Sequence, residues 1–224
     1  MLLFRFLYWI GYDIRDSIKN GRKLHLFGII AIVGLYGGGK TMALTEYLER
    51  MKNRYGDKVI IATNYYFKRQ DFPIESWEDL LKEYDKPIIF GYDELQNEFN
   101  SREYKNFPVS LMTLLTQNRK GHGKQIIYTT QDFETVDKNF RRLTKYVWAC
   151  KTFLGRLTSI KIFNREDFEQ LQYTIEVTKK QRIRPTGKHL FVQTNALREL
   201  YDSFKMLEVA KQKTYVDQLN KESN

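Results

Sequence analysis

Residues 34–41 read GLYGGGKT, which fits the phosphate-binding loop pattern of Gly, four residues, and then Gly-Lys-Ser/Thr. An apolar run at 24–33 precedes the stretch and predicts a buried strand. Apolar residues at helical spacing follow it over 40–55. Glycines let the backbone turn its N–H groups inward, and the start of the following helix adds its positive dipole end. The sequence therefore predicts a loop that binds the phosphates of a nucleotide.

Two side chains of this loop have chemical tasks in such a site. Lys40 is expected to reach the β- and γ-phosphates of ATP, and the hydroxyl of Thr41 to join the ligands of Mg²⁺. The other members of the predicted ATP-binding set are Gly34, Gly37, Gly38, Gly39 and Met42. The alternative is a glycine-rich turn that matches by chance, which in a chain of this length is roughly a one-per-cent event. The strand before the loop and the helix after it favour nucleotide binding.

A pair of carboxylates follows the short apolar strand predicted at 88–92. In a nucleotide-hydrolysing site of this kind the Asp holds Mg²⁺ and the next carboxylate polarises the attacking water, which assigns these tasks to Asp93 and Glu94. An ordinary acidic strand end is the alternative interpretation. The phosphate-binding loop about fifty residues upstream favours the catalytic one.

Polar residues also close the strand predicted at 125–130, where Thr129, Thr130 and Gln131 follow one another. Such residues can sense the γ-phosphate or position water, although a simple turn has the same spacing. Alternation of predicted strands with helices implies parallel strands joined by crossover helices. The loop, the carboxylate pair and this polar strand end then meet at the carboxyl edge of one sheet, where ligands bind in such folds.

The other predicted elements extend this core. They are a strand at 59–63, a short capped helix from Ser76, a helix at 109–120, strands at 145–152, 158–164 and 170–178, and a helix at 196–213. In the last of these strands, apolar residues from Leu171 to Val177 alternate with polar ones, which is typical of a half-buried face.

These elements predict an α/β fold, a P-loop NTPase with a mainly parallel central sheet flanked by helices, extended by antiparallel strands and a C-terminal helix. The predicted parts are an apolar or amphipathic segment at 1–23, an ATPase domain at 24–190 with a basic β extension from about 145, and a C-terminal helix with a polar tail at 191–224.

Basic residues outnumber acidic ones, which gives the chain a net charge of +10. The segment 138–188 holds thirteen Lys and Arg against four Asp and Glu, with aromatic residues between them. This composition suits the backbone of DNA or RNA, single strands especially. The alternative is that the aromatic side chains form the core and the lysines protect a sheet edge.

Cysteine and histidine usage excludes two classes of site. A single cysteine, Cys150, rules out an internal disulfide, and its place in an alternating run predicts a packed thiol in a strand. The three histidines are scattered, so no zinc site is indicated. These features favour a reducing cytoplasm, that of the host cell.

The first ten residues read MLLFRFLYWI, an apolar run too short to span a bilayer, which takes about 20 residues. The run lacks the small-residue cleavage site of a secretory signal. Packing against the core of the protein is the favoured interpretation. The alternative is an amphipathic helix at residues 1–10 that contacts the inner membrane or a partner.

The order of the motifs resembles that of a known family. After the loop come IATN at 61–64, DE at 93–94, NSR at 100–102, NRK at 118–120 and YTTQ at 128–131. Over residues 29–165 this pattern is similar to that of the Zot-like (zonular occludens toxin-like) ATPases, assembly proteins of filamentous phages within the wider FtsK–HerA class of DNA-pumping ATPases. The loop is common to many NTPases, and the later motifs narrow the match.

The resemblance implies further properties. It implies an extra strand between the two motif strands, Mg²⁺ bound through Asp93, water activated by Glu94, and Gln131 as the sensor of the γ-phosphate. It also implies DNA as a partner, contact with phage assembly or coat proteins, and a homo-oligomeric ring in which an arginine reaches the nucleotide of the next subunit. The candidates for that arginine are Arg119, Arg141 and Arg142, with Arg102 a weaker one.

One feature departs from the family. Zot-like proteins generally continue into a membrane-spanning helix and an outer domain, and no such helix follows the ATPase region of this sequence. We therefore expect either membrane contact through residues 1–10 or a soluble packaging motor.

Three functions remain open on the sequence alone. The leading hypothesis is an ATPase that powers the packaging, assembly or export of phage or plasmid DNA. The second is a membrane-docked assembly adaptor that binds nucleotide with little turnover. The third is a small P-loop kinase, for which no acceptor site is recognisable.

Overall fold

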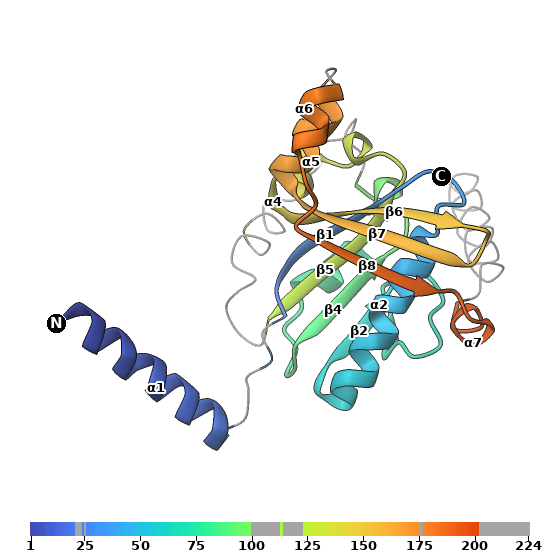
Figure 1. The fold of residues 1–224 in the computed structure, drawn as a ribbon. Helices are drawn as coiled ribbons and strands as arrows, with labels where there is room; N and C mark the ends of the chain where they lie inside the picture. Colours follow the sequence, from blue (N-terminus) through green and yellow to red (C-terminus); the bar gives the residue numbers. More distant parts are fainter. Residues whose placement is uncertain (21–23, 25, 100–112, 114–122, 175–176, 202–224) are drawn as a thin grey trace.

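The computed structural model describes residues 1–20, 24, 26–99, 113, 123–174 and 177–201. Its centre is an eight-stranded sheet with the order β3-β2-β4-β5-β1-β6-β7-β8 (Figure 1). The strands are β1 (Gly28–Val33), β2 (Ile60–Thr63), β3 (Phe72–Pro73), β4 (Ile88–Tyr92), β5 (Lys124–Thr130), β6 (Thr144–Phe153), β7 (Leu157–Asn164) and β8 (Gly187–Val192).

Helices lie on both faces of this sheet, and the first helix of the chain lies apart from it (Figure 1). The α-helices described are α1 (Leu2–Asn20), α2 (Lys40–Tyr55), α4 (Lys138–Leu143), α5 (Arg165–Tyr173), α6 (Val177–Arg182) and α7 (Asn195–Arg198). Short 3₁₀ turns are η1 (Gly56–Lys58), η2 (Trp77–Leu81), η3 (Leu95–Asn97) and η5 (Phe133–Thr135). The capping box predicted from Ser76 is present at η2, where Ser76 and Asp79 bond each other's backbone N–H groups.

Strand pairing confirms the predicted fold class. All pairs from β3 to β6 are parallel, and β6–β7 and β7–β8 are antiparallel. β5 lies between β1, which leads into the phosphate-binding loop, and β4, which ends at the carboxylate pair. This is the extra strand that the family resemblance implied.

The central strands are apolar on both faces because both faces are covered. In β1, Ile30 and Ile32 pack with the side of α2 that carries Leu44 and Leu48. The alternate residues of β1 face a second cluster, which holds large aromatic side chains such as Phe140. Burial on both faces gives continuous apolar runs rather than alternation, as expected for parallel strands. This rigid sheet fixes the carboxyl ends of β1, β4 and β5 beside one another.

The strand predicted at 170–178 is wrong. Residues up to Tyr173 belong to helix α5, and the third antiparallel strand is β8, further along the chain. Two acidic residues in the first turn, Glu166 and Asp167, favour a helix start at this point. Phe168 and Leu171 lie three residues apart and pack against the core, which leaves Tyr173 exposed.

Two predicted helices fall largely outside the described residues. The helix expected at 109–120 has only residue 113 inside them, and the helix expected at 196–213 is described only as far as Tyr201. Within that range α7 begins at Asn195, and the hydroxyl of Thr194 accepts from the N–H of Leu197 at its start. The three-part division at 1–23, 24–190 and 191–224 stays a prediction.

The favoured interpretation of the first ten residues is also wrong. They belong to α1, which lies apart from the body of the protein (Figure 1). Its large apolar side chains are exposed, Leu2 by 87% and Phe4 by 82%, so they do not pack against the core. Among the described helices, none has the length and apolarity that crossing a membrane requires.

The helix at 165–173 predicts a distinct pattern of stabilities. Phe168→Ala should lower the free energy of unfolding by about 3 kcal/mol or more, because it empties a buried site. Tyr173→Ala should change it by about 0.5 kcal/mol or less, since that ring is exposed. Denaturant unfolding monitored by circular dichroism measures both, and equal large losses would favour the strand.

Candidate nucleotide-binding site

The predicted phosphate-binding loop connects β1 to α2 at the carboxyl edge of the sheet. Its turn depends on glycine at two places where φ is positive, Gly37 at 69° and Gly39 at 83°. A third glycine, Gly34, is required for close approach, because a Cβ there would lie 2.6 Å from the carbonyl oxygen of Cys150. The glycines therefore allow the tight backbone turn that the sequence predicted for this loop.

Among the described residues, no side chain caps the start of α2. Gly39 precedes the helix and cannot cap it, and no acidic residue lies in its first turn. Backbone N–H groups at a helix start need acceptors, and the positive end of the dipole favours an anion. The start of α2 is therefore suited to a phosphate group.

Lys40 lies largely buried, with 8% of its surface exposed. Its ammonium donates to the carbonyl oxygen of Leu35 at 3.3 Å, across the loop itself. The same nitrogen lies 5.8 Å from the centre of the Tyr36 ring. One long hydrogen bond leaves the other donors of the ammonium available to an anion placed within the loop.

Thr41 and Asp93 are brought together by the sheet, although 52 positions separate them in the sequence. The Thr41 hydroxyl lies 3.0 Å from both carboxylate oxygens, and the Thr129 hydroxyl donates to Oδ1 at 2.6 Å. Burial raises the pKa of Asp93, and these two hydroxyl groups act in the opposite direction. A hydroxyl and a carboxylate side by side are oxygen ligands of the type that Mg²⁺ prefers.

Asn64 fixes the backbone of the acidic residue, although it was absent from the predicted site. Its side-chain amide donates to the carbonyl oxygen of Asp93 at 3.0 Å and accepts from the N–H of Asp93 at 2.7 Å. This reciprocal pair joins the end of β2 to the end of β4. The IATN motif at 61–64 contained the signal, because an amide after a strand can pair with a neighbouring strand end.

Glu94 adopts a backbone conformation that few residues with a side chain adopt, with φ at 52°. Its N–H donates to the Thr129 hydroxyl at 2.9 Å, and its carboxylate accepts from the Gln131 amide at 3.1 Å. The carboxylate predicted to activate water and the predicted γ-phosphate sensor are therefore in contact. Backbone strain of this kind occurs often at functional sites.

Two of the predicted arginines, Arg141 and Arg142, do not join this group. Arg119 and the weaker candidate Arg102 lie outside the described residues. Arg141 and Arg142 end α4 just before Thr144, which pairs with Ile29 at the beginning of β1. The loop follows the other end of β1, so these arginines lie at the opposite edge of the sheet from their own nucleotide-binding loop.

Residues at the end of β6, in the β extension, contact the backbone of the phosphate-binding loop. The sequence did not predict this contact. Gly38 offers its carbonyl oxygen to the Cys150 thiol at 3.1 Å and to the Thr152 hydroxyl at 3.0 Å. Burial raises the pKa of Cys150 to about 12, so the thiol keeps its proton at neutral pH and donates it. Thr152 is in turn 3.0 Å from the hydroxyl of Thr158.

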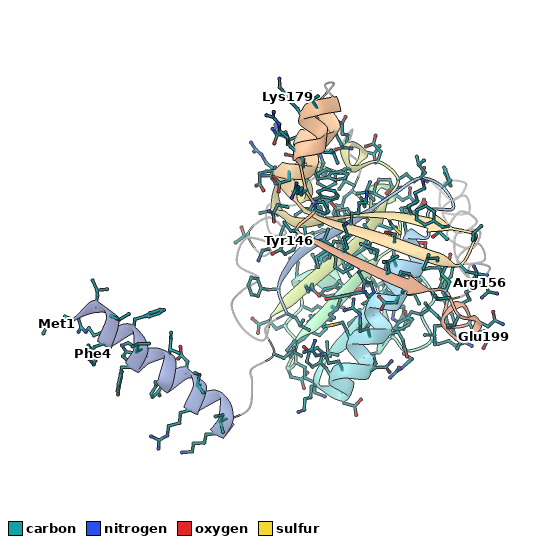
Figure 2. The ribbon with its side chains drawn as sticks, in the orientation of Figure 1. Met1, Phe4, Tyr146, Arg156, Lys179 and Glu199 are labelled. Carbon is teal, nitrogen blue, oxygen red and sulfur yellow. The ribbon has the colours of Figure 1, made fainter. Side chains whose placement is uncertain are left out.

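Gln193 completes what we call the Gly38 network, namely Cys150, Thr152, Thr158 and Gln193. Its buried amide donates to the Thr158 hydroxyl at 2.9 Å, and its amide oxygen accepts from Arg198 at 2.9 Å. Arg156, labelled in Figure 2 near α7, donates to the backbone carbonyl oxygen of Gln193 at 2.8 Å. The network carries contacts from β7 and the segment after β8 to the phosphate-binding loop.

Comparison with known proteins agrees with this fold. No protein-family profile matches the chain, and no curated protein sequence does. Among solved structures, the N-terminal domain of zonular occludens toxin from Neisseria meningitidis has a TM-score of 0.53 and 16% sequence identity. The match covers 79% of this chain and 100% of that domain. The genome packaging NTPase of Sulfolobus turreted icosahedral virus 2 is more distant, at a TM-score of 0.47 and 10% identity, over 76% and 98% of the two chains.

The fold and the glycine-rich loop define the class: the chain has the fold of the P-loop NTPases. Within that class its architecture is similar to that of the zonular occludens toxin N-terminal domain, which agrees with the family resemblance of the motifs. At 16% identity this likeness concerns the fold.

Removal of the Asp93 charge is expected to change the dependence of stability on pH. Because burial raises the pKa of Asp93, the folded protein keeps this proton to a higher pH than the unfolded chain does. The stability that this group contributes is complete at low pH and is lost as the pH rises through the raised pKa. Asp93→Asn, measured without metal or nucleotide, should therefore gain melting temperature relative to wild type as the pH rises from about 4. Asp85→Asn, at an exposed carboxyl, is the control and should show no such gain.

The Gly38 network is expected to support nucleotide affinity. Thr152→Val removes the hydroxyl that bonds the loop carbonyl and should weaken ATP binding about fivefold to tenfold, the effect of one hydrogen bond. Thr186→Val removes a similar bond, to the carbonyl oxygen of Ile162 at 3.1 Å, and should leave affinity unchanged. Isothermal titration calorimetry measures both, and equal affinities would remove the network from the binding site.

Proposed function

We propose that the protein is a Mg²⁺-dependent ATPase. The observation that carries the proposal is the contact of Thr41 with Asp93, which joins the glycine-rich loop to the acidic strand end at one place. Chance similarity to the loop pattern would not require an acidic strand end beside it. The buried carboxylate and the uncapped start of α2 support an ionic ligand there.

In this proposal the residues divide the work between binding and chemistry. Lys40 and the backbone N–H groups of residues 34 and 37–42 bind the phosphates, and Thr41 and Asp93 hold Mg²⁺. The ion, when bound, neutralises charge on the phosphate oxygens. Glu94 orients and polarises a water molecule, and Gln131, which already contacts Glu94, positions it relative to the γ-phosphate.

We further propose that hydrolysis drives packaging, assembly or export of phage or plasmid DNA in the host cytoplasm. The resemblance of the motifs to Zot-like ATPases and the shared fold support this role. Exposed lysines on one face of the antiparallel extension supply charge that suits a DNA backbone, with Lys161 paired opposite Lys188. A homo-oligomeric ring, an arginine supplied by a neighbouring subunit, and phage assembly or coat proteins as partners belong to the same proposal.

An ATPase assay with site variants tests the catalytic part. Lys40→Ala should weaken ATP binding by about tenfold to a hundredfold, because an ammonium–phosphate bond is lost. Glu94→Gln should bind ATP as wild type does and hydrolyse it about a hundredfold more slowly. Lys58→Ala and Glu78→Gln, at exposed positions, are matched controls. Equal turnover in all five proteins would exclude the assigned roles.

The same assay separates the alternative functions. DNA, single- or double-stranded, should stimulate turnover by the wild-type protein if the motor proposal holds. ATP binding without turnover in the presence of DNA would favour a nucleotide-binding assembly adaptor. Transfer of phosphate to an added nucleoside monophosphate would favour a kinase.

A further inference from the structure

The largest apolar surface in the described part of the chain lies on α1. Every large apolar side chain from Leu2 to Tyr12 is exposed, and the least exposed of them, Ile10, is still 38% exposed. In Figure 2 the side chains of α1 project around the helix, which lies apart from the rest of the protein, and Phe4 is labelled near its start. A contiguous apolar surface of this kind marks an interaction site.

The helix has two different halves. Residues 2–12 contain one charged side chain, Arg5, and apolar residues on every side of the helix. Residues 13–20 are amphipathic, since only Ile14 and Ile18 are large and apolar there, on the face that Leu3 and Leu7 begin. Residues 2–12 are therefore suited to an apolar environment on all sides. Residues 13–20 are suited to an apolar environment on one face and to water on the other.

This distribution distinguishes among the occupants of the surface. A second copy of the helix or a groove on a protein would cover one face and leave Trp9 and Tyr12, on the other side, in water. Lipid surrounds an inserted helix on all sides. The first half of α1 therefore matches a membrane better than it matches a protein partner.

The charge of the adjoining sequence agrees with a membrane surface. Residues 15–23 contain four basic residues and one acidic residue, directly after the apolar half. Basic segments beside an apolar one are attracted to anionic lipid headgroups, and the net charge of +10 on the whole chain acts in the same direction.

The length of the apolar half sets how deep it can reach. At about 1.5 Å per residue, residues 2–12 extend roughly 16 Å, about half of the hydrocarbon thickness of a bilayer. Trp9 lies near Tyr8 and Tyr12, with ring centres 5.5 and 5.6 Å apart. Tyr and Trp rings favour the boundary between headgroups and acyl chains, which places Leu2 and Leu3 deeper than this cluster.

We propose that α1 inserts residues 2–12 into one leaflet of an anionic lipid bilayer, with its basic end at the headgroups. The protein is then attached to a membrane surface through the apolar half of this helix. This inference does not depend on the proposed ATPase activity, because no residue of α1 belongs to the candidate nucleotide-binding site.

Vesicle flotation with the full chain tests the proposal. The wild-type protein should float with vesicles of phosphatidylcholine mixed with phosphatidylglycerol, and less with phosphatidylcholine alone. The double variant Leu3→Glu, Leu7→Glu should lose partitioning by about tenfold or more, because charge in the acyl region opposes insertion. Leu190→Glu, at a 60% exposed position of β8, is the matched control and should float as wild type does.

Fluorescence gives a second, local measurement. The anionic vesicles should shift the tryptophan emission of the wild-type protein to shorter wavelength, and Trp9→Phe should abolish the shift while Trp77 and Trp148 remain. Absence of flotation, equal loss in the Leu190→Glu control, or dimerisation through α1 without vesicle binding would overturn the proposal. ATP binding by the same preparations reports folding and the nucleotide site separately, so failure of one proposal is distinguishable from failure of the other.

Discussion

The site depends on one buried carboxylate that three strand ends share. Asp93, at the end of β4, accepts from Thr41 at the start of α2 and from Thr129 in β5, while Asn64 after β2 bonds its backbone. Burial of an unpaired anionic group opposes folding, and the hydroxyl donors offset only part of that effect. A cation, if bound at this point, would offset more of it and would stabilise the folded protein.

Local patterns were sufficient to predict the parts of the fold in which one physical signal acts alone. In β1 and β4, continuous apolar runs favour a strand and no other signal opposes them. Between β1 and α2, the glycines favour a loop in the same unopposed way. At 170–178 two signals competed. The alternation from Leu171 onward favoured a strand, whereas the acidic residues Glu166 and Asp167 favoured a helix that starts slightly earlier. The helix forms because it packs Phe168 in the core.

The candidate site was predictable only as far as its motifs extend. Thr41 and Asp93 belong to sequence patterns whose spatial relation is known. Thr152 contacts Gly38 across 114 positions of sequence, and no sequence pattern predicts that contact. Side-chain exposure is equally non-local. The apolar residues of α1 have the composition of a core element, and only the arrangement of the whole chain shows that the core does not include them.

The left-handed backbone at Glu94 has a consequence for how this protein can change over evolutionary time. That conformation costs about 1 kcal/mol in any residue with a Cβ, and glycine would adopt it freely. A lineage selected only for thermal robustness would therefore drift toward glycine at this position. Retention of an acidic side chain there, in the face of that drift, would be the signature of selection for chemistry rather than for folding.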